Sequence, residues 1–490
     1  MVSKRAAVIG GGPCGLGAIQ TLKQEGIEPV CFERTGHIGG LWRYHDDDVD
    51  GIASVMKTTI INTSKELGAM STFPPLAEYP NYMHNTLMHE YIVKAAEQNG
   101  LLPHVRYHHE TKSIEMAEDY EKTGRWKVTN KNTQTGELVS EIFDFVCVCI
   151  GHHVYPNIPT FPNQEEFEGK IMHTHSLKKV DGFEDQRVVV VGVGNSGMDA
   201  AVELSAVTKQ VMSLNTKTGV SYLHQVVQKN ILGVLVHQEL SLVLVAVEHQ
   251  RPSVICNVIC VVMYCFLLCE ETEADTVFLA TGYKVMFPFL SDDIVRVVDN
   301  KVQLYKFMYP PHLPHPTLAI LGLVQPNGPG FPVGEMQCRW ASRVMSGKLK
   351  LPSKEQMIAD IDERLKWIRG RFVDSPRHTL QVDFISYQDE LAEEIGVKPN
   401  FWKIAFTDPK LFWALLFGPS LSYQYRLQGP HSWDGARNAI LTYKDRIMTP
   451  LQRPGHQKTE NKKQLMNMRL IIKLLFLLPF LYFFFLVMFR

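Results

Sequence analysis

Two glycine-rich turns constrain this chain more than any other feature. Gly10-Gly-Gly-Pro-Cys-Gly15 and Gly192-Val-Gly-Asn-Ser-Gly197 share the spacing G-x-G-x-x-G, and each lies between an apolar run that predicts a strand and a stretch that predicts a helix. In such a unit the first glycine makes the tight turn, the second lets the backbone approach a pyrophosphate, and the third allows close helix packing. The pyrophosphate then lies on the unpaired N–H groups of the helix N-terminus. One such turn also fits plain packing, but two predict two dinucleotide sites with electron transfer between them.

The residues after each turn distinguish the two nucleotides. Glu33 ends the expected strand 28–33, where a carboxylate accepts hydrogen bonds from a ribose diol and repels a 2′-phosphate. This favours FAD or NAD, with a solvated acid at a strand end as the alternative. No acid follows the second unit, whose expected strand 210–217 ends at Lys217, a possible partner for a 2′-phosphate. The second site is therefore predicted to bind NADP. The glycine turn 39–42, which includes Trp42, suits the wrapping of a flavin.

Together these features resemble the flavin-containing monooxygenases, in particular the vertebrate-type, membrane-anchored dimethylaniline monooxygenases (N-oxide-forming). The resemblance covers most of the chain and includes Asn62-Thr-Ser-Lys-Glu66, Tyr79-Pro-Asn-Tyr82, Gly151-His-His153, Phe278-Leu-Ala-Thr-Gly-Tyr283, Tyr423-Gln-Tyr-Arg-Leu427 and Gly435-Ala-Arg-Asn-Ala-Ile440. The identifying motif of the family is Phe-x-Gly-x3-His-x3-Tyr. Here Phe167, Gly169 and His173 match it, and Leu177 replaces the final aromatic residue. A tryptophan there would resemble Baeyer–Villiger monooxygenases, so this position does not separate the two groups.

The resemblance also implies a set of cofactor contacts. The FAD contacts are Gly10, Gly11, Gly12, Pro13, Cys14, Gly15, Glu33, Gly40, Leu41, Trp42, Asn62 and Thr63. The NADP contacts are Ile61, Asn62, Gly192, Gly194, Asn195, Ser196, Gly197, Met198, Asp199 and Lys217. No metal site is expected, because the paired histidines at 108–109, 152–153 and 173–175 lack the i, i+4 spacing of a helix-borne site; they are interpreted as core or surface residues.

The implied activity is oxygenation by NADPH, O2 and a C4a-hydroperoxyflavin. The substrates would be soft nucleophiles such as tertiary amines and thioethers, and the organic chemistry would belong to the cofactors. Asn62 is the candidate catalytic residue, because its amide would lie beside the flavin and NADP and hold a peroxide oxygen. The alternative is a turn asparagine that caps the segment 65–68. Three other functions remain open: a Baeyer–Villiger-type oxygenase, an uncoupled NADPH oxidase that releases hydrogen peroxide, and an inactive membrane-tethered flavoprotein with a damaged NADP domain.

Composition and cysteine spacing narrow the class further. The 490 residues are 45% apolar and 21% charged with a formal net charge of −1, which suits a folded enzyme and gives no electrostatic argument for a nucleic-acid partner. The nine cysteines contain no C-x-x-C pair. This argues against a zinc ribbon, a thioredoxin-like centre or the redox dithiol of a disulfide reductase.

The C-terminus predicts a membrane anchor. Residues 470–489 are apolar except for Lys473, and a helix of this length spans about 30 Å, the thickness of the hydrocarbon core of a bilayer. Lys462, Lys463 and Arg469 precede the segment, so the positive-inside rule places the body in the cytosol. The family resemblance selects the endoplasmic reticulum membrane. A buried core helix or a helix lying flat on the membrane is the alternative.

The expected architecture is an α/β fold with two Rossmann-like dinucleotide-binding domains and a C-terminal anchor helix. An FAD domain (1–155 and 285–451) holds an inserted NADP domain (156–284), followed by a linker (452–469) and the anchor (470–489). Within the insert, residues 219–277 are divergent and shorter than in the family, and their apolar run 252–269 contains four cysteines and no charge. This run is interpreted as a membrane helix, a buried strand pair or a mistranslated stretch.

Overall fold

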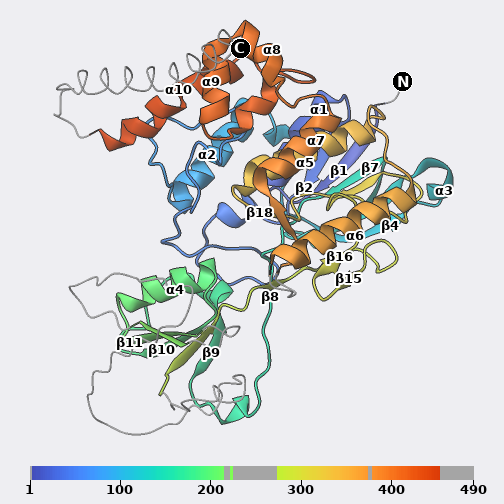
Figure 1. Cartoon of the computed structure of the whole chain (residues 1–490). Helices are drawn as coiled ribbons and strands as arrows, with labels where there is room; N and C mark the ends of the chain where they lie inside the picture. The colour runs from blue at the N-terminus through green and yellow to red at the C-terminus, as the bar shows by residue number, and fades with distance from the viewer. Residues whose placement is uncertain (1–2, 215–220, 225–272, 373–377, 453–490) are drawn as a thin grey trace, which may run out of the picture.

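The computed structural model describes residues 3–214, 221–224, 273–372 and 378–452. Its first glycine turn belongs to a five-stranded parallel sheet in the order β17-β7-β1-β2-β3. Figure 1 labels β1, β2 and β7 of this sheet. The helix α1 (Pro13–Gln24) follows β1 directly and begins at a proline, which is favourable at the first helical position. The strands are β1 (Arg5–Ile9), β2 (Glu28–Phe32), β3 (Val105–Arg106), β7 (Phe145–Val148) and β17 (Leu318–Ile320).

The second glycine turn belongs to another five-stranded sheet, in the order β12-β11-β10-β13-β9. Its strands pair in parallel except at β12, which is antiparallel to β11. The helix α4 (Asn195–Ser205) follows β10, as α1 follows β1. The strands are β9 (Lys170–His173), β10 (Arg187–Val191), β11 (Gln210–Leu214), β12 (Ser221–His224) and β13 (Thr276–Leu279).

Burial explains why both sheets form from short apolar runs. The last four residues of both β1 and β10 are buried, and so is every residue of β7 and β13. Strands that are covered on both faces need continuous apolar residues rather than alternation, and β-branched valines suit the extended backbone. Leu177, at the position where the family motif has an aromatic residue, is 1% exposed and packs in the core of the second sheet.

A three-stranded antiparallel sheet adjoins the first sheet and was only partly expected. It consists of β4 (His109–Met116), β5 (Trp126–Asn132) and β6 (Leu138–Phe143). The sequence predicted β5, whose Trp126, Val128 and Asn130 alternate inward. It did not predict β4 and β6, because each of these strands buries a single residue and lacks a clear apolar pattern.

The rest of the described chain is mainly helical. The helix α5 (Gly330–Met345) packs along α1, and β17 returns the chain to the first sheet. The other helices are α2 (Asn85–Gln98), α3 (Tyr120–Thr123), α6 (Lys354–Arg371), α7 (Phe384–Glu394), α8 (Phe401–Thr407), α9 (Pro409–Phe417) and α10 (Ala436–Met448). Short strands are β8 (Tyr155–Pro156), β14 (Tyr283–Lys284), β15 (Val297–Val298), β16 (Lys301–Val302), β18 (Gln325–Asn327) and β19 (Gln381–Asp383). The 3-10 turns are η1 (Gly40–Trp42), η2 (Leu102–His104), η3 (Gln164–Glu166), η4 (Thr174–Ser176), η6 (Ser422–Arg426) and η7 (Thr449–Leu451).

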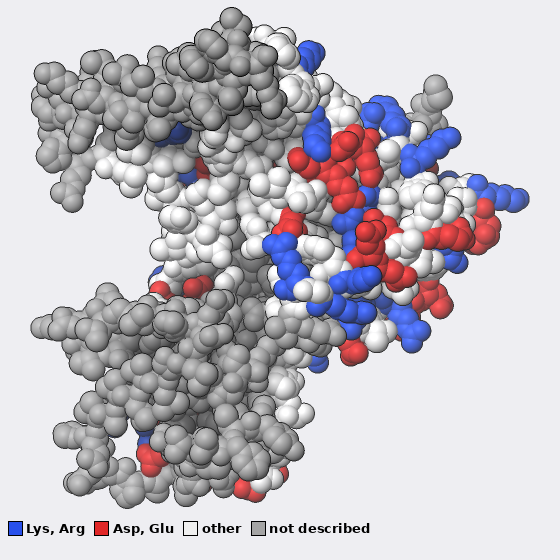
Figure 2. Space-filling model, viewed as in Figure 1, with Lys and Arg blue, Asp and Glu red and all other residues white. Residues whose placement is uncertain are grey.

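Basic and acidic side chains lie side by side on the face that Figure 2 shows. Around α6, Arg364 pairs with Asp360 at 2.8 Å, and Arg371 pairs with Asp383. Among the residues the structure describes, no helix has both the length and the apolar character to cross a bilayer. The predicted anchor 470–489 lies outside these residues, as do Lys217 and the run 252–269.

Candidate functional site

The first turn requires glycine at both ends. Gly10 has a φ of +101°, and a Cβ there would lie 2.8 Å from the carbonyl oxygen of Cys149. A Cβ on Gly15 would lie 1.9 Å from the carbonyl oxygen of Gly10. Side chains at these two positions would therefore break the turn from β1 into α1.

Gly12, between them, has a different reason to be glycine. A Cβ there would meet only backbone atoms of Gly40, the nearest at 3.7 Å. Gly12 is the N-cap of α1, its backbone is extended, and no side chain caps the helix. Within the described part of the chain, the N–H groups of this first turn have no side-chain acceptor. This cradle fits a pyrophosphate, and a bulky residue at Gly12 would fill it.

Glu33 lies beside this cradle. Its carboxylate accepts hydrogen bonds from the backbone N–H of Gly11 at 2.8 Å and from the N–H and hydroxyl of Thr35 at 2.9 and 2.8 Å. It is 8% exposed, so it is not the solvated strand-end acid of the alternative interpretation. A carboxylate has about four lone-pair sites, so acceptor capacity remains for a ribose hydroxyl.

The glycine turn 39–42 is held against the cradle. A Cβ on Gly40 would lie 3.1 Å from the Cα of Gly12, and a Cβ on Gly39 would lie 2.5 Å from the His89 ring on α2. His89 Nε2 lies 3.0 Å from the carbonyl oxygen of Ile38. Trp42 contacts Phe331 at the start of α5 edge-on, with ring centroids 6.0 Å apart. The turn thus forms one wall beside the start of α1.

Asn62 is exposed on a firmly anchored segment. The preceding Ile61 donates its N–H to the carbonyl oxygen of Met83 at 2.9 Å. Three residues after Asn62, Lys65 is 1% exposed and donates to three backbone carbonyls, one of them that of Ala77 at 2.8 Å. Burial lowers the pKa of Lys65. The Asn62 side chain is therefore exposed between two anchored positions.

The next residues settle how the turn after Asn62 is capped. The backbone N–H of Leu67 reaches the hydroxyl of Ser64 at 3.4 Å, and the Asn62 side chain accepts a long hydrogen bond from Thr63, also at 3.4 Å. Ser64 therefore occupies the capping role that was the alternative interpretation of Asn62. Glu66 anchors the segment that follows Asn62 to α10 through a buried ion pair with Arg446, at 2.7 Å.

The second turn repeats the geometry of the first. Gly192 has a φ of +111°, and a Cβ there would lie 2.5 Å from the carbonyl oxygen of Ala280. A Cβ on Gly197 would lie 2.0 Å from the carbonyl oxygen of Gly192. The N-caps Gly12 and Gly194 share a φ of −75°, with ψ of −179° and −178°. Asn195, Ser196, Met198 and Asp199 are exposed on the first turn of α4, where a second pyrophosphate and its ribose fit.

Four histidines and a tyrosine gather near the end of β9, an arrangement that sequence spacing did not show. The rings of His153 and His173 lie 5.2 and 5.3 Å from the ring of Tyr283, and His152 lies 4.2 Å from His153. Burial lowers the pKa of His152 to about 3 and that of His153 to about 4, so both are neutral at pH 7. Within the described ranges no group of three or more His, Cys, Asp or Glu is arranged to hold a metal.

His175 joins this group to the loop that follows η1. Its ring nitrogens lie 3.1 Å from a carboxylate oxygen of Asp48 and 2.9 Å from the carbonyl oxygen of Ile52. The N–H of Lys57 donates to the carbonyl oxygen of Lys178 at 2.8 Å. These contacts connect a loop near the first glycine turn to the segment that follows β9.

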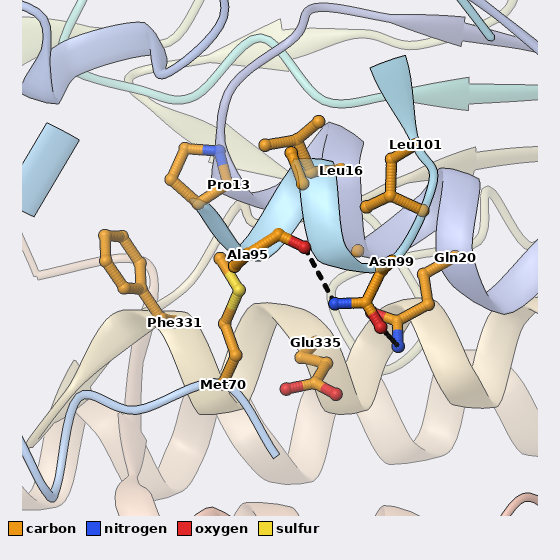
Figure 3. A pocket seen from close by; sticks show the side chains of 11 residues that line it. Pro13, Leu16, Gln20, Met70, Ala95, Asn99, Leu101, Phe331 and Glu335 are labelled. Carbon is orange, nitrogen blue, oxygen red and sulfur yellow. Dashed lines mark hydrogen bonds between the residues drawn. The ribbon is translucent and has the colours of Figure 1, made fainter. Parts of the chain in front are cut away.

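A small pocket between α1, α2 and α5 is distinct from both turns (Figure 3). Its walls are mostly apolar, with Gln20, Asn99 and Glu335 as polar residues. The Asn99 amide donates to the carbonyl oxygen of Ala95 at 2.8 Å and accepts from Gln20 at 3.4 Å. Of the predicted cofactor contacts only Pro13 lines this pocket, so it is not the dinucleotide site.

Comparison with known proteins decides the family. The model of the flavin-binding monooxygenase-like family matches residues 3–262 and 267–489. The chain belongs to this family. This flavin-binding monooxygenase is 39% identical to rat flavin-containing monooxygenase 5, over 96% of this chain and 98% of the relative. It is 38% identical to human flavin-containing monooxygenase 2, over 94% of this chain and 95% of the relative.

Solved structures agree on the fold. S-allyl-L-cysteine S-oxygenase from Allium sativum matches with a TM-score of 0.67 and 24% identity, over 92% of this chain and 99% of that one. Tmm from Pelagibacter sp. strain HTCC7211 matches with a TM-score of 0.59 and 20% identity, over 80% and 85%. The predicted family, the predicted enzyme class and the predicted cofactors are thereby confirmed: the chain is a flavin-dependent monooxygenase that uses FAD and NADPH.

Proposed function

We propose that this monooxygenase uses NADPH and O2 to oxygenate soft nucleophiles, namely amine nitrogen and thioether sulfur. The amine is supported by a relative from Pan troglodytes named dimethylaniline monooxygenase [N-oxide-forming] 2, which is 38% identical over 94% of this chain and 95% of its own. The observation that carries the proposal is the pair of glycine turns with matching geometry, one in each parallel sheet.

The assignment of the two turns is part of this proposal. FAD would bind the turn 10–15 with Glu33 on the ribose, the glycine turn 40–42 beside the pyrophosphate, and Asn62 and Thr63 nearby. NADP would bind the turn 192–199, with Ile61 and Asn62 facing it from the other side. The assignment is supported by the buried carboxylate beside the first turn, which would repel a 2′-phosphate. Lys217 is proposed as the partner of the 2′-phosphate because it ends the expected strand 210–217 after the second glycine turn.

The proposed domain division follows the sheets. Strand β17 pairs with β7 in the first sheet, which supports the assignment of residues 285–451 to the FAD domain with 1–155. Strands β9 and β13 pair with each other in the second sheet, which supports the inserted NADP domain 156–284. The chain thus leaves the first sheet after β7 and returns to it at β17.

The chain's own residues would bind and orient the reactants. Reduced by NADPH, the bound flavin supplies the activation of O2. The glycine turns hold both phosphate groups without side chains in the way. Asn62 offers an amide donor and an acceptor on a segment that Lys65 and Glu66 immobilise, so no large rearrangement is needed to place it. His152 and His153, whose pKa values burial lowers to about 3 and about 4, are neutral at pH 7 and add no charge in the group around Tyr283.

The test is to measure product and cofactor consumption together. Purified protein is mixed with NADPH, air and either a tertiary amine or a thioether, and N-oxide or sulfoxide is compared with NADPH consumed and hydrogen peroxide released. Product close to the NADPH consumed supports the proposal. Hydrogen peroxide alone indicates an uncoupled oxidase, and an ester formed from an added ketone indicates a Baeyer–Villiger oxygenase. A flavin that NADPH never reduces indicates an inactive flavoprotein.

We also propose that residues 470–489 anchor the enzyme to the endoplasmic reticulum membrane with its body in the cytosol. The support is the sequence: an apolar run that follows the basic residues Lys462, Lys463 and Arg469. Deletion of 470–489 is expected to release the enzyme from carbonate-washed membranes, and Western blotting of pellet and supernatant measures it. Retention of the truncated protein in the pellet would assign the attachment to another surface.

A further inference from the structure

The helices α1 and α5 pack against each other at two glycines. A Cβ on Gly17 of α1 would lie 3.8 Å from the Cα of Glu335, and one on Gly334 of α5 would lie 3.9 Å from the Cβ of Cys14. Because neither glycine has a side chain, the backbones of α1 and α5 come close enough for Cys14 and Cys338 to contact the opposite helix. Cys14 precedes Gly17 by three residues and Cys338 follows Gly334 by four, so each shares a helix face with its glycine.

Two thiols meet at this crossing. The sulfur atoms of Cys14 and Cys338 are 3.7 Å apart, and the Cys338 thiol also lies 3.3 Å from the carbonyl oxygen of Cys14. A disulfide bond is about 2.05 Å long, so closure requires an approach of about 1.7 Å. Cys338 is buried, whereas Cys14 is partly exposed at the start of α1.

The two thiols differ in their readiness to react. The thiols of Cys149 and Cys338 hydrogen-bond to Cys14 and hold its pKa well below the ordinary value, against the opposing effect of burial. The start of α1 adds the positive end of a helix dipole. Burial raises the pKa of Cys338 and that of Cys149, so both stay protonated. Cys14 is thus suited to be the attacking group and Cys338 the resolving thiol.

We propose that Cys14 and Cys338 form a peroxide-sensitive thiol pair, which closes into a disulfide between α1 and α5 and weakens FAD retention. In the first step the Cys14 thiolate attacks hydrogen peroxide, its sulfur takes one oxygen, and hydroxide leaves. In the second step the sulfur of Cys338 attacks the sulfenic sulfur of Cys14 and loses its proton, and the oxygen departs as water. The protein gives up two electrons and hydrogen peroxide is reduced to water.

The effect on FAD rests on the proposed assignment of the first turn. Cys14 lies between Gly12 and Gly15, in the first turn of α1. The backbone of this turn is tightly packed: a Cβ on Gly15 would lie only 1.9 Å from the carbonyl oxygen of Gly10. Drawing Cys14 toward α5 therefore moves the N–H groups that would hold the pyrophosphate.

Peptide mass spectrometry tests the thiol pair without reference to FAD. The full-length protein is treated with hydrogen peroxide, remaining thiols are alkylated, and the protein is digested with trypsin. Cys14 and Cys338 then lie in the peptides 6–23 and 307–339, while Cys149 lies in 132–170. We expect a cross-linked species of 6–23 with 307–339 that is about 2 Da lighter than the sum of the two peptides and that disappears on reduction. Its absence, or a cross-link from 6–23 to 132–170 instead, overturns the proposal.

Matched variants test the effect on FAD. FAD content is measured after desalting, with and without peroxide, in the parent, in Cys338→Ala and in the control Cys31→Ala, whose buried cysteine lies in β2. Peroxide should lower FAD retention several-fold in the parent and in Cys31→Ala, reversibly on reduction, and leave Cys338→Ala unchanged. A cross-linked parent that keeps all its FAD overturns the coupling. Untreated protein that never binds FAD refutes the assignment of the first turn, while the cross-link result stands by itself.

Discussion

At the scale of single residues, the two glycine turns contain positions of two kinds. At Gly15 and Gly197 a Cβ would lie 1.9 and 2.0 Å from a carbonyl oxygen, far inside van der Waals contact, so the fold itself requires glycine there. A Cβ on Gly12 would meet only Gly40, at 3.7 Å, so the fold tolerates a side chain there, and we expect the proposed pyrophosphate to be what requires glycine. Substitutions at the two kinds of position should therefore fail in different ways.

Gly12→Val is expected to yield folded protein without flavin, and Gly15→Ala is expected to destabilise the FAD domain. The valine fills the pyrophosphate cradle, whereas the alanine collides with the backbone inside the turn. Flavin absorbance per protein and thermal unfolding measure the two effects. Gly370→Ala in α6 is the control, because nothing lies within 4 Å of its Cβ and alanine favours a helix by about 0.5–1 kcal/mol. Full flavin content in Gly12→Val contradicts the assignment.

Asn62→Asp is expected to keep FAD and accept hydride from NADPH while product formation falls and hydrogen peroxide release rises. An ionised aspartate has no donor, and its charge opposes the negative charge that develops during oxygen activation. The measurement is the ratio of sulfoxide to hydrogen peroxide with a thioether substrate. Ser64→Ala is the matched control: it removes the cap of the turn and should lower stability slightly without changing that ratio. An unchanged ratio in Asn62→Asp would leave Asn62 without a catalytic role.

At the scale of elements, the C-terminal end of α1 is stabilised by ion pairs, whereas its N-terminal end depends on glycines. The side chain of Glu25, 1% exposed, lies 2.8 Å from the ammonium of Lys348 and 2.9 Å from the His431 ring, and it also contacts Arg343 at 3.4 Å. Burial of the carboxylate raises its pKa, but Lys348, His431 and Ser346 outweigh burial and lower it to about 2. These partners lie beyond or at the end of α5, so α1 and the C-terminal helices are joined at this point.

The Glu25 cluster predicts an acid-dependent loss of stability. The pKa falls from an ordinary value of 4.5 to about 2 on folding, so the ionised carboxylate stabilises the folded state fully above about pH 4.5. This contribution is lost as the pH falls to about 2. Glu25→Gln should therefore unfold more easily than the parent at pH 7, by about 1–2 kcal/mol after screening at the exposed Lys348. The difference should shrink at pH 3 in urea unfolding curves, and a constant difference at both pH values would exclude the ionic mechanism.

At the scale of the whole molecule, the sequence revealed what depends on neighbours in the chain and missed what depends on distant partners. Strand β10 begins and ends where its valine run predicted, and both glycine turns were found from their spacing. The helices α5 to α10 were not expected individually, because residues 285–451 were assigned only as a whole to the FAD domain. The Tyr423–Leu427 motif gave no hint of its role, because Arg426 pairs with Glu335 of α5, 91 residues away. The contact of Cys14 with Cys338, 324 residues apart, likewise leaves no spacing signal.

The last prediction concerns the contact between the two halves of the site. His175 and Lys178 follow β9, both are 5% exposed, and both face Asp48 on the loop after η1, at 3.1 and 3.9 Å. The Asp48→Ala variant leaves the buried Lys178 cation without its carboxylate and frees the loop from His175. Because hydride transfer depends on how the second nucleotide is placed over the first, we expect flavin reduction by NADPH to slow about tenfold or more. Anaerobic stopped-flow measurement of flavin absorbance follows this rate, and FAD content should remain full because Asp48 lies outside the first cradle. Asp46→Ala is the control, since the Asp46 carboxylate accepts a hydrogen bond from Tyr44 on the same loop, at 2.8 Å, and its loss should leave the rate unchanged. If the two variants reduce at the same rate, the Asp48 contact stabilises the loop without positioning NADPH.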